Sequence, residues 1–270
     1  MSKEPFILRE KEFFHVPFSK GDDSIVAGFT TRNGGVSLPP YTSLNMGFHV
    51  QDVESAVKKN REIVASKIGF PLQSWIVGEQ VHGAQIQKVT VKDTGSGAMQ
   101  VEDAIKGVDG LYTNEPNILL TSLYADCVPL YFVSPKTNFI GLAHAGWRGT
   151  VGAIGPRMID LWTEKEGVPL EDIHCVIGPA IGKQQYEVDQ KVIDEVKKVC
   201  DSHFTVVSEN KFLLDLQQVN RTLIEKAGIP AENIRKSSYC TASNLEFFFS
   251  HRKEKGKTGR MMSFIGRRSV

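Results

Sequence analysis

Two apolar runs joined by a short polar segment constrain the fold of the central part of the chain. Residues 128–133 and 138–143 flank Ser-Pro-Lys-Thr, a composition typical of a turn, and together they predict a β-hairpin. With the turn centred between Pro135 and Lys136, Cys127 and His144 are expected to be cross-strand partners. Directly opposed residues have Cβ atoms roughly 4.5–5.5 Å apart. At that spacing a thiolate and an imidazole can share a metal ion; a buried cysteine beside a hydrogen-bonded histidine is the alternative.

His82, in the segment GEQVHG, is the best candidate for a third ligand. It lies between two strand-like runs and precedes Gly83, where the backbone can turn tightly. A His/Cys/His set leaves one tetrahedral position open, which is the pattern of a catalytic zinc. Such a metal makes a nucleophile by lowering the pKa of its bound water toward ~7. The spacing of His82, Cys127 and His144 matches neither HExxH nor paired CxxC, so the sequence alone leaves the site a hypothesis.

Composition limits the class of protein and of ligand. A chain of 270 residues with 41% hydrophobic residues can bury a large core, and we expect a single domain over residues 1–270. No run of 18 apolar residues occurs, and the start, MSKEPFILREKEFF, is too charged for a secretory signal, so we expect a soluble cytoplasmic protein. A net charge of +1 indicates neither a nucleic-acid nor a membrane partner, which favours a small ligand. The four cysteines lack CxxC pairing and are expected to be thiols.

Strands and helices alternate along the sequence, which predicts a mixed α/β or α+β sandwich. The segment 92–107 is polar and glycine-rich and is expected to be an exposed excursion. Asp52 is a plausible cap for a helix that Gly69 ends, and Asp215 and Gly228 have the same roles in a later helix. The expected helices cover residues 53–68, 150–165, 189–200 and 215–227, and the expected strands cover 24–31, 74–80, 84–90, 117–124, 128–133, 138–143, 174–178 and 204–207.

Several loop residues are candidates for substrate binding. Arg32 follows a strand among glycines, where a guanidinium can bind phosphate through paired hydrogen bonds or can be a solvated turn residue. Asn45 and His49 are expected to line the same loop. Arg148 either contacts an anion or caps the end of the hairpin. Arg61 lies inside the first helix and is expected to be a surface or ion-pair residue.

A set of motifs resembles a known family. The segments FTTRNGGVSLPPYTSLNMGFHV, GEQVHG, ADCVPLYF, HAGWRGT, IGPAIGKQQYEVD and FFFSHRK, followed by TGR, occur in order between about Phe29 and Arg260. They are similar to the family of bacterial YlmD/YfiH-type proteins and the animal laccase domain-containing protein. The resemblance implies a layered α/β/β/α sandwich with mixed sheets. It also implies a zinc bound by His82, Cys127 and His144, the same three residues that the hairpin and the loop indicate.

The same resemblance implies an activity. The family is described as purine nucleoside phosphorylases that act on adenosine, inosine, guanosine and S-methyl-5′-thioadenosine, with adenosine deaminase activity as well. The partners are then purine nucleosides and phosphate, and we expect a monomer. Arg252 and Arg260 acquire site roles from the resemblance alone. Where this chain reads SHRK many members read closer to SYRR, so the role of His251 stays open.

Other functions are compatible with parts of the sequence. Older labels call the family a polyphenol oxidase or laccase, but a multicopper oxidase needs many imidazoles and this chain has seven histidines and no HxH pair. Copper can still occupy a His/Cys/His site because it binds most N/S ligand sets more tightly than zinc. A metal-free cysteine hydrolase would use Cys127 as nucleophile and His144 as base. A non-catalytic binding module is the third class. For deamination, Glu79 is the candidate proton carrier, although the HxE pattern of zinc nucleobase deaminases is absent.

Overall fold

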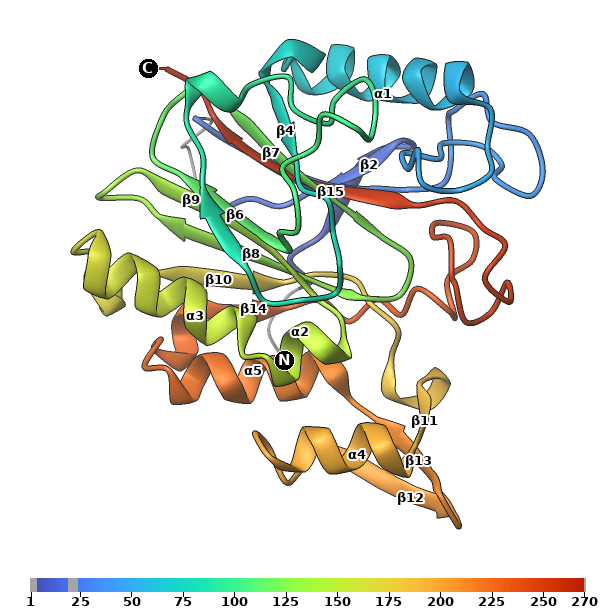
Figure 1. Cartoon of the computed structure of the whole chain (residues 1–270), viewed down its shortest axis with the longest axis vertical. Helices are drawn as coiled ribbons and strands as arrows, with labels where there is room; N and C mark the ends of the chain where they lie inside the picture. The colour runs from blue at the N-terminus through green and yellow to red at the C-terminus, as the bar shows by residue number, and fades with distance from the viewer. Residues whose placement is uncertain (1–3, 19–23, 270) are drawn as a thin grey trace.

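Two six-stranded mixed sheets and one small three-stranded sheet make up the β-structure (Figure 1). The computed structural model describes residues 4–18 and 24–269, so the first three residues of the charged N-terminal segment lie outside it. The first sheet has the order β1 (Ile7–Glu10), β2 (Phe13–His15), β3 (Ile25–Thr30), β15 (Met261–Arg267), β7 (Leu119–Tyr124), β4 (Trp75–Val77). The second has the order β14 (Ile234–Lys236), β10 (His174–Ile177), β8 (Val128–Ser134), β9 (Phe139–Ala145), β6 (Gly110–Thr113), β5 (Ile86–Lys88). The third has the order β11 (Glu187–Asp189), β13 (Lys211–Leu214), β12 (Phe204–Ser208).

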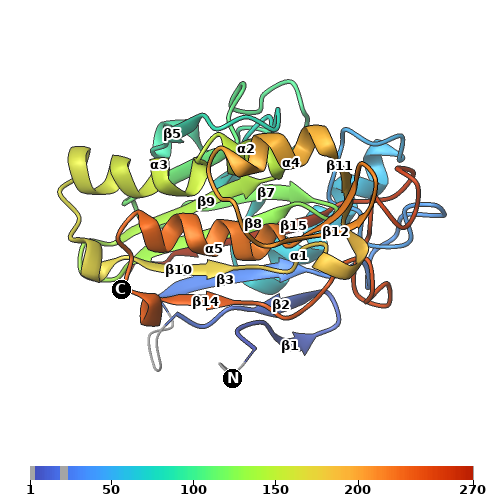
Figure 2. The same ribbon diagram turned by 90° about the horizontal axis from the view of Figure 1, so that it is seen from below.

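The two large sheets pack face to face, and helices cover their outer faces. Helix α1 (Glu54–Ile68) lies over the first sheet, where Val64 and Ile68 join a core cluster with Leu119 and Phe264. On the other side, α3 (Ile154–Asp160) and α5 (Leu216–Lys226) lie across the second sheet (Figure 2). This arrangement confirms the layered α/β/β/α sandwich with mixed sheets.

Strand β8 shows why its sequence is almost continuously apolar. Leu130 and Phe132 belong to the cluster beneath α3 and α5, whereas Tyr131 and Val133 belong to the cluster between the two sheets. Successive side chains of a strand point to opposite faces, so a strand in an inner layer must be apolar on both. The strand that follows Cys127 is thereby anchored on two sides.

The predicted hairpin is present, but its register differs from the expectation. Ser134 pairs with Phe139, and Pro129, not Cys127, lies opposite His144. The cause is Asn138, which was expected to begin the second strand but adopts a left-handed φ of 64° and belongs to the turn. The centre of the turn therefore moves by one residue, and Cys127 becomes a diagonal neighbour of His144. Because the displacement across the pair is two residues, both side chains keep the same face.

Two helix predictions need correction. Asp52 does not cap α1, because the N-cap is Val53 and the Asp52 carboxylate accepts hydrogen bonds from the Ser37 hydroxyl and the Asn45 amide. The expected helix over 150–165 is divided into α2 (Trp147–Val151), α3 and a π-helical turn, Leu161–Lys165. Pro156 explains the break, since its ring would clash with the carbonyl of residue 152 in a continuous helix but is tolerated in the first turn of α3.

Most other predictions of secondary structure agree with the fold. The Asp215 cap on α5 and the Gly69 end of α1 are present. The segment 92–107, which was expected to be exposed, is partly buried, because Ala98 joins the core cluster beneath α1 and Ala104 is buried in the same loop. Helix α4 (Gln190–Lys197) is shorter than expected, and the strand runs at 74–80 and 84–90 form only β4 and β5. Sequence patterns did not indicate β1, β2, β6, β11, β13, β14 or β15.

The third sheet and α4 form a lobe at one end of the molecule (Figure 1). Val188 and Phe212 of this lobe join the same hydrophobic cluster as Ile224 of α5. A hydrophobic cluster shared by the lobe and the second sheet supports our proposal that residues 1–270 form a single domain. No helix in the described part of the chain is long and apolar enough to cross a membrane.

Candidate metal centre

Cys127 and His144 meet at the open end of the central hairpin. His144 lies near the end of β9 and is 2% exposed, whereas Cys127 precedes β8 and is half-buried. Asp126, just before Cys127, has a left-handed φ of 86°. Its carboxylate accepts hydrogen bonds from Thr241 Oγ1 (2.6 Å), Ser250 Oγ (3.0 Å) and the backbone N–H of residue 252 (2.7 Å). These hydrogen bonds hold the turn that carries the Cys127 thiol against the C-terminal loop, residues 237–260 between β14 and β15.

His82 reaches the same place from the loop after β4. Its ring centroid lies 4.8 Å from that of His144, with the rings nearly perpendicular. The buried carboxylate of Asp109 accepts hydrogen bonds from the backbone N–H groups of Val81 (3.2 Å), His82 (3.0 Å) and Gly83 (2.7 Å). The same carboxylate is 2.8 Å from His144 Nδ1. One side chain therefore orients two of the three candidate ligands and leaves His144 Nε2 as the ligand atom.

The histidines beside Cys127 favour the ionised form of its thiol. Burial alone would raise the pKa of Cys127, but the neighbouring His144 and His82 lower it to about 6. Burial would lower the pKa of His144, whereas the Cys127 thiolate and the Asp109 carboxylate raise it to about 9. For Asp109 burial also opposes ionisation, and the hydrogen bonds from His144, Gly83 and Val81 hold its pKa below the usual range. Cys127 is thus a thiolate at neutral pH, which is the form that binds metal.

The donor set fits a zinc ion. The ligand atoms of His82, Cys127 and His144 all lie within 4.8 Å of one another. Zinc bonds of ~2.0–2.3 Å in a tetrahedron separate the ligand atoms by roughly 3.3–3.8 Å, so a small inward movement closes the shell. Gly146 lines the same space, since a Cβ there would be 3.1 Å from Cys127 Sγ and 3.3 Å from His82 Cδ2. In residues 4–18 and 24–269 no other cluster of at least three His, Cys, Asp or Glu side chains could hold a metal.

A cavity of about 310 Å³ opens beside this centre. Its volume is at the lower end of the ~300–1,000 Å³ typical of small-molecule sites. All three candidate ligands line it, together with apolar side chains and five cationic or titratable groups from other segments. The lining includes Phe48, His49, Arg61, Val77, Glu79, Gln80, Val101, Ala104, Leu123, His251 and Arg260. The three candidate metal ligands therefore line a cavity of a size that suits a small organic molecule.

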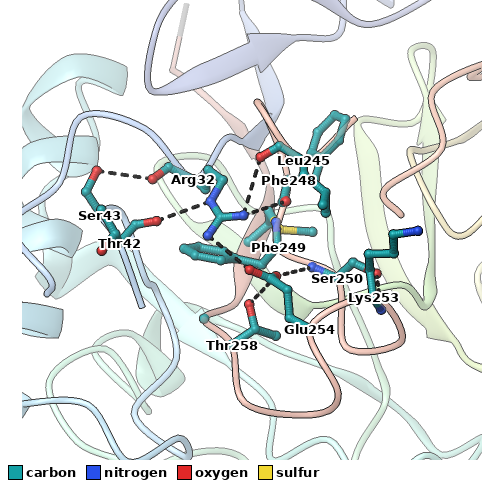
Figure 3. A network of polar contacts seen from close by, with 12 residues as sticks. Arg32, Thr42, Ser43, Leu245, Phe248, Phe249, Ser250, Lys253, Glu254 and Thr258 are labelled. Carbon is teal, nitrogen blue, oxygen red and sulfur yellow. Dashed lines mark hydrogen bonds and ion pairs between the residues drawn. The ribbon is translucent and has the colours of Figure 1, made fainter. Parts of the chain in front are cut away.

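Arg32 lies outside this cavity, in a polar network of its own (Figure 3). Its guanidinium pairs with Glu254 at 3.1 Å and donates to the carbonyls of Thr42 (3.2 Å) and Leu245 (3.3 Å). It also stacks on Phe249, 4.6 Å from the ring centroid. These contacts join the loop after β3 to the C-terminal loop and favour a structural role. The substrate-binding role stays a prediction.

The other predicted substrate residues are also not on the cavity wall. Asn45 is fully buried; its amide donates to the Gly47 carbonyl and its oxygen accepts from the backbone N–H of Arg260. Arg148 is exposed and stacks on Trp147, 4.2 Å from the ring. Arg252 donates to the carbonyl of residue 187 at 2.7 Å. Direct contact of these three residues with a substrate stays a prediction. Asn45 is placed to support the loop that carries Arg260.

Some residues of the site differ from the expectation. Arg61 was expected at the surface or in an ion pair, but it is 1% exposed and lines the cavity. His49 was expected to line the same loop as Arg32, and it lines the cavity instead, as does Glu79, which forms an ion pair with Lys106 at 3.6 Å. Asp109 was missed altogether. Its only sequence signal is an acidic residue between apolar and glycine neighbours at the start of β6, which is too weak to single it out.

Comparisons with known proteins give the family. Residues 26–268 match the family described as multi-copper polyphenol oxidoreductase laccase. The chain is 46% identical over 251 residues to purine nucleoside phosphorylase YlmD of Bacillus subtilis (strain 168), covering 92% of this chain and 90% of that protein. It is 47% identical over 247 residues to purine nucleoside phosphorylase YlmD of Geobacillus stearothermophilus (strain DSM 13240 / CIP 106956 / 10), covering 90% of each.

Solved structures give the same result. The crystal structure of YlmD from Geobacillus stearothermophilus superimposes with a TM-score of 0.96 at 44% identity, covering 99% of this chain and 100% of that one. The crystal structure of Bacillus licheniformis hypothetical protein YfiH gives 0.95 at 45% identity, covering 98% and 99%. The chain therefore belongs to the laccase-like family of YlmD and YfiH, the family that its sequence motifs resemble.

Proposed function

We propose that the protein is a zinc-dependent purine nucleoside phosphorylase that also deaminates adenosine. Its proposed substrates are adenosine, inosine, guanosine and S-methyl-5′-thioadenosine, with phosphate as the second substrate of phosphorolysis. The names of the two YlmD relatives support phosphorylase activity. The zinc, the deaminase activity and the substrate range rest on the sequence motifs and on the donor set.

The convergence of His82, Cys127 and His144 on the wall of one cavity carries this proposal. A thiolate and two imidazoles suit zinc, and the set leaves a coordination position free for chemistry. Copper binds similar ligands, so metal analysis has to decide between the two ions. When bound, zinc supplies Lewis-acid polarisation and a nucleophile that is active at neutral pH.

The chain's own residues provide binding and orientation. Asp109 fixes the tautomer and direction of His144 through Nδ1. The apolar side chains of Phe48, Val101 and Leu123 line the cavity and suit a flat purine base. In phosphorolysis a phosphate oxygen bonds to the sugar C1′ while the C1′–N bond to the base breaks. The departing nitrogen keeps the electron pair and then takes a proton. Glu79, which lines the cavity, is the proposed proton carrier in deamination.

We further propose a monomer that acts in the cytoplasm without a nucleic-acid or membrane partner. The four cysteines are all free thiols, as expected in a reducing compartment. The almost balanced charge, +1 overall, provides no general attraction for a polyanion.

A nucleoside panel on metal-analysed protein tests the function. Each nucleoside is incubated with and without inorganic phosphate, and free base, ribose 1-phosphate, free ribose and deaminated nucleoside are separated by chromatography. We expect base and ribose 1-phosphate in equal amounts from inosine only when phosphate is present, and inosine from adenosine without it. Free ribose from phosphate-independent base release would make the protein a hydrolase and contradict the proposal.

A metal-free cysteine hydrolase is the second candidate, and one observation favours it. Cys127, His144 and Asp109 form a thiolate–imidazole–carboxylate series, with the pKa of the thiol lowered to about 6. Metal content separates the two functions, because a bound zinc occupies the thiolate that would be the nucleophile. Activity that increases when zinc is removed would favour the hydrolase.

A further inference from the structure

The cavity carries a second group of polar side chains beside the metal centre. His49 comes from the loop before α1, Arg61 from within α1, and Arg260 from the residue before β15. All three line the same cavity as the metal ligands. Two arginines from distant segments therefore line one small cavity, and the question is what balances their positive charges.

Arg61 is a buried cation without an acidic partner. Its Nε and Nη2 donate to the Met46 carbonyl at 3.0 and 2.8 Å, and its Nη1 donates to the carbonyls of Gly97 (2.6 Å) and Ala98 (2.9 Å). Burial lowers its pKa to about 9, so it stays protonated at neutral pH. None of the ion pairs in the described part of the chain includes Arg61. Carbonyl dipoles and the Phe48 ring, whose centroid is 4.3 Å from the guanidinium carbon, stabilise this buried charge. Because no carboxylate in the described part of the chain pairs with it, the charge favours a bound anion nearby.

Arg260 presents free donors to the cavity. Its backbone N–H donates to Asn45 Oδ1, and its Nη1 donates to the carbonyls of Thr258 (2.9 Å) and Gly259 (3.0 Å), which fixes the guanidinium. Among the described residues, its Nε and Nη2 have no hydrogen-bond partner, and no carboxylate forms an ion pair with it. Gly47 makes room for its stem, because a Cβ there would be 2.9 Å from Arg260 Cγ. Two neighbouring N–H groups of a fixed guanidinium match the oxygens of phosphate.

The remaining charges of the cavity do not cancel the two arginines. Burial first, and then the positive charges of Arg260 and Arg61, lower the pKa of His49 to about 4, so His49 is a neutral hydrogen-bonding group at pH 7. Two anionic side chains line the cavity. Glu79 pairs with Lys106, and the Cys127 thiolate belongs to the metal centre, where His82 and His144 lie beside it. A dianion in the cavity would therefore find an uncompensated positive field close to the metal centre.

We propose that Arg260, with the charge of Arg61 and the ring of His49, binds the phosphate co-substrate. This inference rests on the proposed phosphorylase function and replaces Arg32 as the anion-binding residue. The site would hold phosphate in the cavity that also contains the metal centre, so that an oxygen can attack C1′ of a nucleoside in the same space. The 5′-phosphate of a nucleotide has the same chemistry, and the experiment has to separate the two.

The test compares Arg260→Gln and Arg260→Lys with Arg9→Gln, which removes the same charge from an exposed position on β1. Steady-state phosphorolysis of inosine is measured on zinc-loaded protein while phosphate and inosine are varied separately. We expect Arg260→Gln to raise the KM for phosphate by about 10- to 100-fold, as for the loss of hydrogen bonds between charged groups. The KM for inosine should change less than about threefold, and Arg260→Lys should recover part of the loss because it keeps the charge but not the fork.

Calorimetric titration of zinc-loaded protein with inorganic phosphate alone gives a second readout that needs no turnover. Binding to wild type and to Arg9→Gln but not to Arg260→Gln supports the site, even if the nucleoside panel rejects phosphorolysis. Equal phosphate binding by Arg260→Gln and wild type overturns it, as does an unchanged phosphate KM. If Arg260→Gln weakens inosine 5′-phosphate but not inorganic phosphate, the anion belongs to a nucleotide and the co-substrate assignment is wrong. Urea unfolding of each variant shows whether a loss of binding reflects a loss of fold.

Discussion

Replacing Asp109 by Asn should weaken zinc binding strongly. The two carboxylate oxygens divide four donors between them: Oδ1 accepts from the backbone of His82 and faces Nδ1 of His144, and Oδ2 accepts from the backbone of Val81 and Gly83. Asparagine has the same shape but one acceptor oxygen, so either orientation turns an NH2 group toward two donors. The remaining pair also loses the negative charge.

The magnitude follows from those contacts. Each hydrogen bond to a charged group contributes about 1.5–3 kcal/mol, so losing two costs about 3–6 kcal/mol before relaxation of the loop. We expect the metal-free variant to lose about 3 kcal/mol of unfolding free energy. Because Asp109 orients both histidine ligands, zinc affinity should fall by about 10- to 100-fold, the range typical of such outer-shell carboxylates. Competition with a chromophoric chelator measures the affinity, and urea unfolding in excess chelator measures the stability.

Asp172→Asn is the matched control. Asp172 is another buried carboxylate, and it accepts hydrogen bonds from the Ser134 hydroxyl and the backbone N–H of Lys136 at the turn of the hairpin. Its replacement should reduce stability without changing zinc affinity. An unchanged zinc affinity in Asp109→Asn, or an equal loss in Asp172→Asn, would refute the role of Asp109 as the residue that orients the ligands.

Three further outcomes are expected. Gly146→Ala should reduce zinc affinity several-fold in the chelator assay without lowering stability, because its φ of −64° suits alanine while the new Cβ would be 3.1 Å from Cys127 Sγ; unchanged affinity would contradict this geometry. Arg32→Gln should lose about 2 kcal/mol of stability to urea through its broken pair with Glu254 and leave the phosphate KM unchanged; a raised KM at full stability would restore the anion-binding role. In metal-free wild type the thiolate absorbance of Cys127, identified by its loss in Cys127→Ser, should appear near pH 6. His144→Ala should move this titration toward the ordinary thiol pKa, because the depressed pKa of Cys127 needs the neighbouring imidazolium. A midpoint near 9 in wild type would contradict the ion pair.

The same ion pair predicts how the stability of the metal-free protein depends on pH. The pKa of Cys127 is depressed to about 6, so its contribution is fully present above the ordinary value of 9.0 and is lost as pH falls toward 6. The pKa of His144 is raised to about 9, so its contribution is fully present below 6.5 and is lost as pH rises toward 9. Urea unfolding should therefore show the largest contribution of the pair between about pH 6 and 9, and His144→Ala should remove that maximum. A profile that is the same in both proteins would argue against the pair.

The sequence predicted the central hairpin and the meeting of Cys127 with His144 because their signals are local or have a fixed period. The strand period of two residues keeps Cys127 and His144 on one face even though the turn centre was misplaced by one residue. The error came from Asn138, whose left-handed conformation depends on the turn that it helps to form. The sequence could determine that Cys127 and His144 share one face of the sheet, but not which residue lies directly opposite His144.

The surroundings of the metal could not be predicted in the same way. Local sequence places Arg32 in a glycine-rich loop and Arg61 inside a helix, but it does not show what either guanidinium contacts. In the fold Arg32 joins two loops, whereas Arg61 is buried at the cavity wall. What separates them is the packing of the 97–98 loop and of the C-terminal segment, which are distant in sequence. Asp109 and Arg260 acquire their roles through contacts of the same long-range kind.

Zinc titration of metal-stripped protein tests the central claim most directly. Hypoxanthine release from inosine and phosphate is followed as zinc is added to wild type and to Cys127→Ala. We predict that the rate rises with zinc, reaches its plateau at one zinc per chain, and stays at background in Cys127→Ala, because the thiolate completes the His82, Cys127, His144 set. Full phosphorolysis by metal-free wild type, or a plateau of the same height and stoichiometry in Cys127→Ala, would contradict the account.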